Sequence, residues 1–561
     1  MVARSDVVNP MPIQRVHFIE YNPKVNTLGS RAILPKYGTP LLAAILRERG
    51  LAVRIFLEGV SDMNFEEMTD CDLVCFPVYG PALTKVRDCA RRIRRERPQL
   101  PIIMGGPFVC LATDTVLDVC DYAVRGEGDE VLPELIDCLS RGADEHAVSG
   151  ISFLEGGHPV HTPDRPPPPI PATIPDLTLI EGFDRATRGT GRREVMNTLQ
   201  TSRGCNFRCK FCSAAKLFAG VYRNRDIDSI IEDLRAKLRY NKYFLVVDNS
   251  FLSNRKRTIE LLHRLAKENL GAHLIIFERH EIGKDTELLQ LMWKAGVHCI
   301  IVGIESLVDE NLRIYDKRQT SRDVAASVQN ILENNIHVIG TFILGGDGDT
   351  RETAADIVRF VKSTGISMNL LVFILHEMEE DEINGPIIPL SRRFRTYYTR
   401  RDPNNLDYYD YLTGNFVTYF PKRMKPSTLQ QCMVDTYQEV YSHREILRRA
   451  FSKNVFNSIF GVAHAFGMKR LSETVIDSMN NYYLDFLRQI EQGLYDKDEV
   501  LIDERLASLE SLPVPKRLEP RLDNDSYRNL MSLYLLPGFI RERLTQLRQS
   551  CSAIWASRTP A

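Results

Sequence analysis

The chain has 561 residues, which is too long for one hydrophobic core, so we expect about three or four domains of roughly 100 to 200 residues each. Its content of 43% hydrophobic and 26% charged residues is that of an ordinary globular protein and excludes the disordered and fibrous classes. Because 72 Lys and Arg oppose 73 Asp and Glu, the overall charge does not direct the chain to nucleic acid or to anionic membranes.

The N-terminus lacks the apolar segment of a signal peptide, and no apolar run is long enough to cross a bilayer. Of the twelve cysteines, three stand together and the others are scattered, as in a protein whose thiols stay reduced. We therefore expect a cytoplasmic protein without a transmembrane segment and without a nucleic-acid partner.

The first domain is expected at residues 15–148, after an N-terminal tail at 1–14. Short apolar runs alternate there with helical patterns, which predicts an α/β fold with a doubly wound parallel sheet. Glycine and proline gather where the predicted strands end, at 77–81, 105–107 and 126–128. The carboxyl ends of such strands are where this kind of sheet binds ligands.

A linker is expected at residues 149–194. It begins with a hairpin signal at Gly156 and Gly157 and continues with the proline-rich run "DRPPPPIPATIPD". Proline blocks both a helix interior and a central strand, so we expect this segment to end the first domain.

Strand and helix patterns resume at residues 195–380, where six strand-helix units predict a second parallel sheet curled into a partial (β/α)6 barrel. Residues 381–561 favour a mostly helical C-terminal domain that closes over the barrel mouth and selects the substrate. Tyrosines and arginines crowd its start, where a pocket lining and ordinary core packing explain them equally well: Tyr397, Tyr398, Arg400, Arg401, Tyr408, Tyr409 and Tyr411.

Three cysteines, Cys205, Cys209 and Cys212, follow a predicted strand in a loop that Gly204 opens. A structural zinc site closes with four ligands, usually as two Cys-x2-Cys pairs, and the sequence has no second pair. Chance packing is a poor explanation for three thiols so close together beside charged side chains. Three thiolates on a four-iron cluster leave one iron free for an outside ligand, which makes an iron-sulfur cluster the favoured interpretation.

The spacing Cys-x3-Cys-x2-Cys, with Phe211 before the last cysteine and at the first strand of a six-unit domain, resembles the radical S-adenosylmethionine (SAM) superfamily. The resemblance implies a [4Fe-4S] cluster whose free iron is chelated by the amino and carboxylate groups of SAM, next to Phe211. It implies reductive cleavage of SAM to methionine and a 5′-deoxyadenosyl radical, with an electron donor such as flavodoxin or ferredoxin.

The same resemblance implies further SAM contacts at the ends of later strands. The stretch "VYRNRD" also looks like the segment that follows the cluster loop in this superfamily. An ordinary strand-end turn, or a solvated strand end, is the alternative at these positions. The residues are Asp248 and Asn249 in "VVDNS", Glu305 in "VGIES", and Gly345 and Gly346 in "FILGGDGDT".

The first domain resembles the cobalamin-binding domain of cobalamin-dependent radical SAM enzymes. The classical Asp-x-His-x-x-Gly motif is absent from the sequence, so we expect cobalt without a histidine on its lower face. A vestigial or protein-docking sheet is the alternative. The matching stretches carry the expected corrinoid-binding residues: Tyr79 and Gly80 in "FPVYGPA", Gly105 and Gly106 in "GGPFV", and Gly126, Glu127 and Gly128 in "AVRGEGDEVLPELI".

Together the two resemblances imply a methyltransferase that moves a methyl group from methylcobalamin to an unactivated carbon of a natural-product, lipid or tetrapyrrole substrate. Ring formation or rearrangement is an alternative outcome of the same chemistry. A methylthiotransferase for transfer RNA would need a second cluster in the first domain, and a corrinoid-binding sensor would not need the three loop cysteines. Thiols for that second cluster are available in the sequence at Cys71, Cys75, Cys89, Cys110, Cys120 and Cys138.

Overall fold

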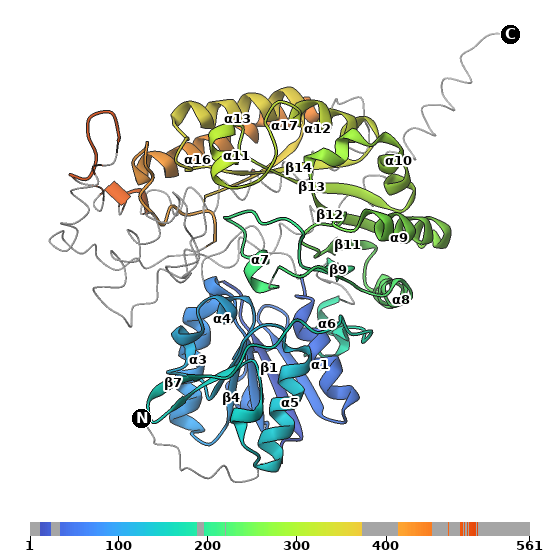
Figure 1. Cartoon of the computed structure of the whole chain (residues 1–561), viewed down its shortest axis with the longest axis vertical. Coiled ribbons are helices and arrows are strands. Elements are labelled where there is room, and N and C mark those ends of the chain that lie inside the picture. The colour runs from blue at the N-terminus through green and yellow to red at the C-terminus, as the bar shows by residue number, and fades with distance from the viewer. Residues whose placement is uncertain are drawn as a thin grey trace.

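The structure is a computed structural model, and it describes residues 12–23, 34–187, 196–218, 220–372 and 413–450, with 469, 483–485, 487–488, 491, 493–500 and 502. Two α/β units stand one above the other, with the shorter elements α4 and α7 between them (Figure 1). Each unit is built on its own sheet, as the alternating strand and helix patterns predict.

The first sheet has seven strands in the order β2-β1-β3-β4-β5-β6-β7, and its first five strands are parallel. Its central strands are buried along nearly their whole length, because helices cover both faces. The elements are β1 Arg15–Glu20, α1 Gly38–Glu48, β2 Ala52–Leu57, α2 Phe65–Thr69, β3 Leu73–Pro77, α3 Leu83–Glu96, β4 Ile102–Gly105, α4 Pro107–Leu111, β5 Tyr122–Val124, α5 Gly128–Arg141, β6 Ile151–Glu155, β7 His158–His161 and α6 Phe183–Thr187.

The hairpin of β6 and β7 does not belong to the linker, contrary to the sequence prediction. Strand β6 pairs antiparallel with β5, so the hairpin extends the first sheet by two strands. The sequence signals a hairpin but not the sheet that it joins, because pairing to β5 is decided by burial of the shared face, where Ser152 is fully buried. The proline-rich run at 163–176 contains neither helix nor strand, as predicted.

The second sheet has six parallel strands in the order β15-β14-β13-β12-β11-β8, which is chain order and agrees with a curled βα unit (Figure 1). A separate two-stranded pair, β9 with β10, flanks the cysteine loop. The elements are β8 Asn197–Leu199, β9 Ser202–Arg203, α7 Ala214–Leu217, β10 Arg223–Asn224, α8 Ile227–Leu238, β11 Tyr243–Val246, α9 Arg255–Glu268, β12 His273–Arg279, α10 Thr286–Lys294, β13 Val297–Glu305, α11 Asp309–Ile314, α12 Val324–Glu333, β14 His337–Ile343, α13 Arg351–Thr364, β15 Ser367–Leu371, α16 Pro426–Val440 and α17 His443–Ala450.

Tyr437 of α16 and Tyr441, the residue that follows this helix, cover the open edge of the sheet at β15. The Tyr441 hydroxyl accepts from Met368 N (2.8 Å) and donates to Met368 O (2.6 Å). The Tyr437 hydroxyl does the same with Leu370 N (2.9 Å) and O (2.8 Å). The two tyrosines are four residues apart along the chain, a rise of about 6 Å in a helix, and their partners are two residues apart in the strand, a rise of about 6.6 Å. Because these spacings match, the N–H and C=O groups at this edge have hydrogen-bond partners without another strand.

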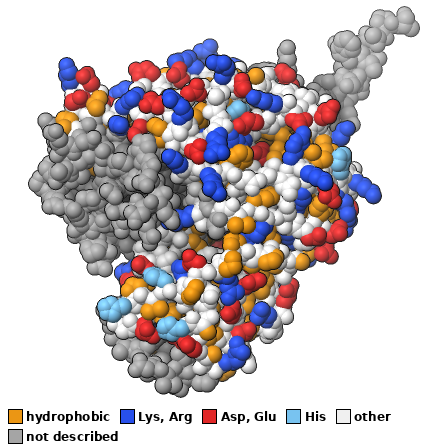
Figure 2. Space-filling model, viewed as in Figure 1, with side chains coloured by type: hydrophobic (Ala, Val, Ile, Leu, Met, Phe, Trp, Pro, Cys, Tyr) orange, Lys and Arg blue, Asp and Glu red, His pale blue; other side chains and the backbone are white. Residues whose placement is uncertain are grey.

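In the described part of the chain no helix is long and apolar enough to cross a membrane. Positive and negative side chains are interspersed over the face shown in Figure 2, in keeping with the near-zero net charge. Among the described residues of the C-terminal region, those of α16 and α17 are helical, whereas residues 413–425 and 493–500 form turns and irregular segments.

Candidate functional site

The cysteine loop runs from Cys205 to Cys212, between β9 and α7. Gly204 opens it with φ +85°, and a Cβ at this position would stand 2.1 Å from the carbonyl oxygen of Val221. Only glycine fits here, because the backbone at Val221, just before β10, lies against this position. The loop therefore leaves the sheet at a fixed point.

The loop thiols lie near one another and near cationic side chains. Burial raises the pKa of the half-buried Cys209, and the charges of Cys212 and Cys205 raise it further, whereas Lys317 lowers it. Iron would supply the positive charge that keeps such thiols deprotonated, so the donor set fits a cluster. Among the described residues no three His, Cys, Asp or Glu side chains are already arranged around a metal position, so this assignment rests on the spacing and the thiol chemistry.

Phe211 holds the loop against the segment that follows α11. Its ring packs edge-on against Tyr315 with centroids 5.5 Å apart, and Lys210 N donates to the carbonyl of Tyr315 (2.9 Å). Lys317 Nζ is 5.8 Å from the Phe211 ring and donates to Glu305 Oε1 at 2.9 Å. Glu305, at the end of β13, is thus a buried carboxylate with a cationic partner beside the loop.

Asp248 follows β11 and is buried, with its carboxylate turned toward the base of the cysteine loop. It accepts from Thr201 N and Ser202 Oγ (2.7 Å each), and from Thr201 Oγ1. These bonds fix the strand that leads into Gly204, which is a positioning role beside the predicted contact with SAM. The neighbouring Asn249 is exposed.

The glycine turn after β14 is closed by a carboxylate. Asp349 Oδ2 accepts from Gly345 N (2.9 Å) and Gly346 N (2.8 Å), and Asn311 Nδ2 donates to Asp349 Oδ1 (2.7 Å). A Cβ on Gly345, whose φ is +101°, would meet the Tyr419 hydroxyl at 2.2 Å. The close neighbours of these glycines are therefore side chains of the protein itself, and their predicted approach to adenosine stays a prediction.

The first-domain glycines gather at one edge, where β3, β4 and β5 end side by side. Val78 N donates to Gly105 O (2.7 Å), and a Cβ on Gly106 would lie 3.1 Å from the Val78 backbone. A Cβ on Gly80 would likewise contact the Phe108 ring. A Cβ on Gly128, the first residue of α5, would contact the side chain of Leu42. Gly126 has open space beside it, so a ligand can approach its backbone.

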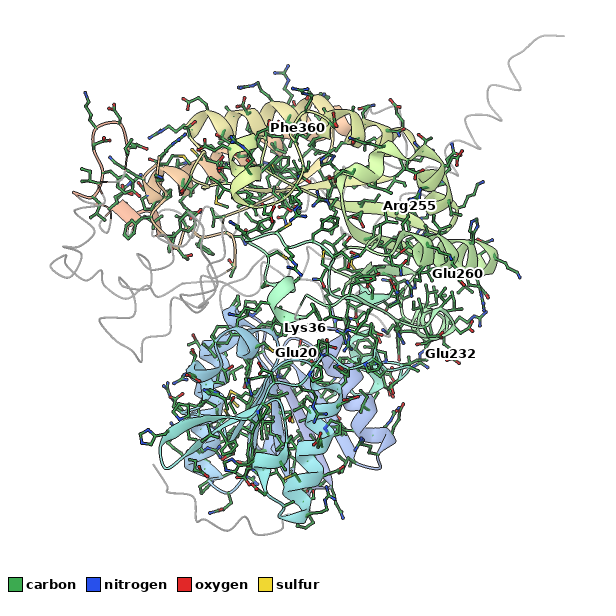
Figure 3. All side chains as sticks on the ribbon, viewed as in Figure 1. Glu20, Lys36, Glu232, Arg255, Glu260 and Phe360 are labelled. Carbon is green, nitrogen blue, oxygen red and sulfur yellow. The ribbon has the colours of Figure 1, made fainter. Side chains whose placement is uncertain are left out.

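A buried charge cluster lies at the end of β1, on the side of the first domain that faces the barrel (Figure 3). Glu20 accepts from Thr39 Oγ1 (2.7 Å) and pairs with Lys36 Nζ (3.0 Å). Lys36 Nζ stands 3.6 Å from the centroid of the Tyr79 ring, and burial raises the pKa of that tyrosine. In this strand order the crevice between β1 and β3 is the switch point, where sheets of this kind bind ligands. The contact of Tyr79 with a corrinoid stays a prediction.

Glu127 does not face open space. It pairs with two arginines of the second unit, Arg203 of β9 and Arg223 of β10, and Arg203 also pairs with Asp129. A corrinoid contact by the Glu127 carboxylate, as predicted from the sequence, would have to compete with two guanidinium partners. The sequence analysis missed both arginines as functional residues, although both stand in or beside the stretches that it singled out.

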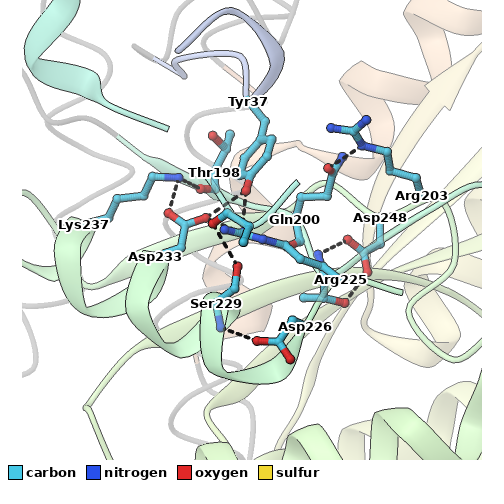
Figure 4. A network of polar contacts seen from close by, with 12 residues as sticks. Tyr37, Thr198, Gln200, Arg203, Arg225, Asp226, Ser229, Asp233, Lys237 and Asp248 are labelled. Carbon is cyan, nitrogen blue, oxygen red and sulfur yellow. Dashed lines mark hydrogen bonds and ion pairs between the residues drawn. The ribbon is translucent and has the colours of Figure 1, made fainter. Parts of the chain in front are cut away.

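A second buried network joins the units at Tyr37 (Figure 4). The Tyr37 hydroxyl donates to Asp233 Oδ2 (2.9 Å), which also accepts from Arg225 Nη1 (2.7 Å). Lys237 Nζ pairs with Asp233 Oδ1 (2.7 Å) and donates to Thr198 O (2.8 Å). Both sheets therefore meet through buried polar contacts, at the edge of β8.

Comparison with known proteins gives a family match for each of the two α/β units. Residues 199–361 match the radical SAM superfamily, and residues 23–136 match the B12 binding domain. The chain therefore combines a B12 binding domain with a radical SAM domain. It uses a [4Fe-4S] cluster, SAM and cobalamin, and the fold, cofactors and methyltransferase class predicted from the sequence are confirmed.

Several curated relatives of this radical SAM enzyme are methyltransferases. An uncharacterized methyltransferase of Pyrococcus horikoshii is 27% identical over 346 residues, covering 59% of this chain and 74% of the relative. The hopanoid C-3 methylase of Methylococcus capsulatus is 27% identical and covers 51% and 56%. The anaerobic magnesium-protoporphyrin IX monomethyl ester cyclase of Rubrivivax gelatinosus is 24% identical and covers 74% and 75%.

The fold also resembles a solved structure over almost its whole length. The cobalamin-dependent SAM radical enzyme OxsB, with aqua-cobalamin and SAM bound, aligns at a TM-score of 0.58 and 15% identity, covering 98% of this chain and 82% of that one. The domain order of this enzyme is therefore that of a cobalamin-dependent radical SAM fold.

The six first-domain cysteines that a methylthiotransferase would need are not grouped at a metal position among the described residues. Burial raises the pKa of each of them, as expected of thiols that pack as small hydrophobic groups: Cys71, Cys75, Cys89, Cys110, Cys120 and Cys138. The relatives do not favour this alternative or the sensor. The predicted pocket tyrosines and arginines at 397–411 lie outside the described residues.

Proposed function

We propose that this enzyme methylates an unactivated carbon of a lipid, tetrapyrrole or natural-product intermediate. Relatives named for methylation of hopanoids support the lipid and polycyclic part of this range. The observation that carries the proposal is structural: the ligand edge of the first sheet faces the cysteine loop. Helix α4, which follows Gly106, contacts α7, which follows Cys212.

The cluster and SAM supply a carbon radical, and the corrinoid supplies the methyl group. The residues of the chain would hold these groups in place by ordering the cysteine loop. Asp248 and Gly204 fix the start of the loop, and Phe211 with Tyr315 fixes its middle. Lys317, paired with Glu305, places positive charge beside the thiols, where it favours their deprotonated form.

The test is anaerobic reconstitution with iron, sulfide and cobalamin, followed by reduction in the presence of SAM and candidate substrates. Methylation predicts 5′-deoxyadenosine together with S-adenosylhomocysteine. Deoxyadenosine that forms without S-adenosylhomocysteine indicates ring formation or rearrangement instead. The absence of both products from protein with a full iron complement refutes the proposal, and replacement of Cys205, Cys209 and Cys212 by alanine is the matched negative control.

A flavodoxin or ferredoxin as electron donor and a cytoplasmic location complete the proposal. The support is chemical, because reductive SAM cleavage needs a low-potential one-electron donor and the cluster needs a reducing compartment. Turnover with purified flavodoxin and its reductase in place of a chemical reductant tests the donor.

A further inference from the structure

Four charged side chains form a buried group between the corrinoid edge and the cysteine loop. We name this group the acid-arginine clamp: Glu127 and Asp129 of the first domain, and Arg203 and Arg223 of the second. Arg203 Nη2 donates to Asp129 Oδ1 (3.2 Å) and its Nη1 donates to Glu127 and Asp129, while both terminal nitrogens of Arg223 donate to Glu127 (3.2 Å from Nη1 to Oε2). The side chains are 7% to 14% exposed.

The charges of the clamp balance, with two carboxylates against two guanidinium groups. Burial by itself would lower the pKa of Arg203, but Asp129 and Glu127 raise it above its ordinary value, so the arginine stays charged. Removing one partner of such a group leaves a buried charge without an opposite charge beside it. Arrangements of the two domains in which these four side chains do not meet are therefore strongly disfavoured. Glu127 and Asp129 also stand at the N-terminus of α5, where the helix dipole favours negative charge.

The position of the clamp matters more than its strength. Glu127 lies between Gly126 and Gly128, in the loop where β5 ends and where a corrinoid is expected. Arg203 directly precedes Gly204, and the strand that carries it is held on its other side by Asp248. The clamp therefore joins the loop of one cofactor site to the first residues of the other, across 74 to 96 positions of sequence.

We propose that the acid-arginine clamp sets the distance and orientation between the corrinoid and the cluster-bound SAM, so that its four members are positioning residues for methyl transfer. This inference rests on the proposed function. The enzyme has two reactions of SAM, and they differ in whether the two cofactor sites must be correctly placed relative to each other. Reductive SAM cleavage needs only the cluster domain, whereas methylation of the corrinoid by SAM needs both domains in register.

The second of these reactions can be followed without the substrate. The methyl carbon exchanges its bond to sulfur for a bond to the reduced cobalt, whose electron pair it takes, and S-adenosylhomocysteine leaves as a neutral thioether. Titanium(III) citrate supplies the electrons that bring the cobalt to its reduced state. The amount of S-adenosylhomocysteine then reports the register of the two sites, and the amount of deoxyadenosine reports the cluster site alone.

The experiment compares holoenzyme carrying Arg203→Lys or Asp129→Asn with the wild type. We expect S-adenosylhomocysteine formation to fall by roughly ten- to 100-fold, because a misplacement of about 1 Å can cost that much. Deoxyadenosine formation, iron content and the Kd for cobalamin should each stay within about twofold of the wild type. Hydrogen exchange of the apoprotein should rise at residues 201–204 and 223–225, which tests the clamp without any cofactor.

Matched controls come from a second arginine-carboxylate pair of the first domain, Arg87 with Asp118. Arg87 is as buried as Arg203 but joins α3 to the segment before β5, away from the cysteine loop. Arg87→Lys is the matched control for Arg203→Lys and should leave the ratio of the two products unchanged.

Three results would overturn the inference. Equal loss of both products in the clamp variants would mean that the clamp only stabilises the fold. A weaker Kd for cobalamin in both variants would mean that the clamp shapes the corrinoid site itself and does not set the distance between the two sites. Unchanged amounts of both products in both variants would mean that the clamp does not set the relative position of the two cofactor sites. If the wild type itself forms no deoxyadenosine, the proposed function fails instead.

Discussion

Removal of the Asp233 carboxylate is the sharpest test of how the two units are joined. Asp233 is completely buried on α8 and accepts from the Tyr37 hydroxyl at 2.9 Å. Arg225 and Lys237 each stand 2.7 Å from it. The variant Asp233→Ala leaves both cations buried without a counter-charge and removes the acceptor of the Tyr37 hydroxyl proton.

The expected cost follows from these contacts. At an effective dielectric constant of about 20, an opposite charge at about 4 Å is worth about 4 kcal/mol, and breaking a buried ion pair typically costs about 3 to 5 kcal/mol. For a cooperative unit of about 350 residues, an unfolding entropy of about 2.1 cal/mol/K per residue converts this cost into a Tm lowered by about 4 to 7 °C.

The deficit should also depend on pH. Burial lowers the pKa of Lys237, whereas Asp233 raises it, so the pKa falls further once Asp233 is removed. The unfolded variant then binds more protons than the folded one, and its stability rises with pH. We therefore expect the deficit to be smaller at about pH 9 than at about pH 7, because the pKa of an unfolded lysine, near 10.4, lies above both values.

Scanning calorimetry of the apoprotein at both pH values measures the effect. The matched control is Asp228→Ala, on the same helix, whose carboxylate is 78% exposed and pairs with Arg264. Such a surface pair is worth about 1 kcal/mol or less, so its Tm should hardly move. If Asp233→Ala melts within about 1 °C of the control, the buried network does not join the two units as described.

Three further changes have defined outcomes. Gly204→Ala puts a Cβ 2.1 Å from Val221 O, so anaerobic reconstitution should load much less iron, and full iron content would contradict the steric argument. Tyr441→Phe leaves the N–H and C=O of Met368 at the β15 edge without the hydroxyl and should cost about 1 to 3 kcal/mol in urea unfolding, whereas an unchanged midpoint would show that the edge is satisfied otherwise. Burial raises the pKa of Asp349 to about 7, so the folded state holds a proton that the unfolded state gives up near pH 4. That contribution favours folding at low pH and is lost as pH rises through about 7; Asp349→Asn should flatten the change in stability between about pH 5 and 8, and an unaltered profile would assign it to other groups.

The local part of this protein can be read from the order of its residues. Strand and helix periods predicted two parallel sheets, because the direction of each side chain follows from backbone geometry alone. The spacing of Cys205, Cys209 and Cys212 predicted the cluster, because three donors on one short loop need no partner from elsewhere in the chain. The glycines at 105, 106, 126 and 128 marked the ligand edge for the same local reason.

The tertiary structure decided which charged groups meet. Asp248 turned out to hold the strand before Gly204, Glu127 pairs with Arg203 and Arg223, and the β6-β7 hairpin joins the first sheet. No sequence pattern links Glu127 to arginines that lie 76 and 96 positions away. A buried charge is stable only beside an opposite charge, and which two charges become neighbours depends on how whole elements pack.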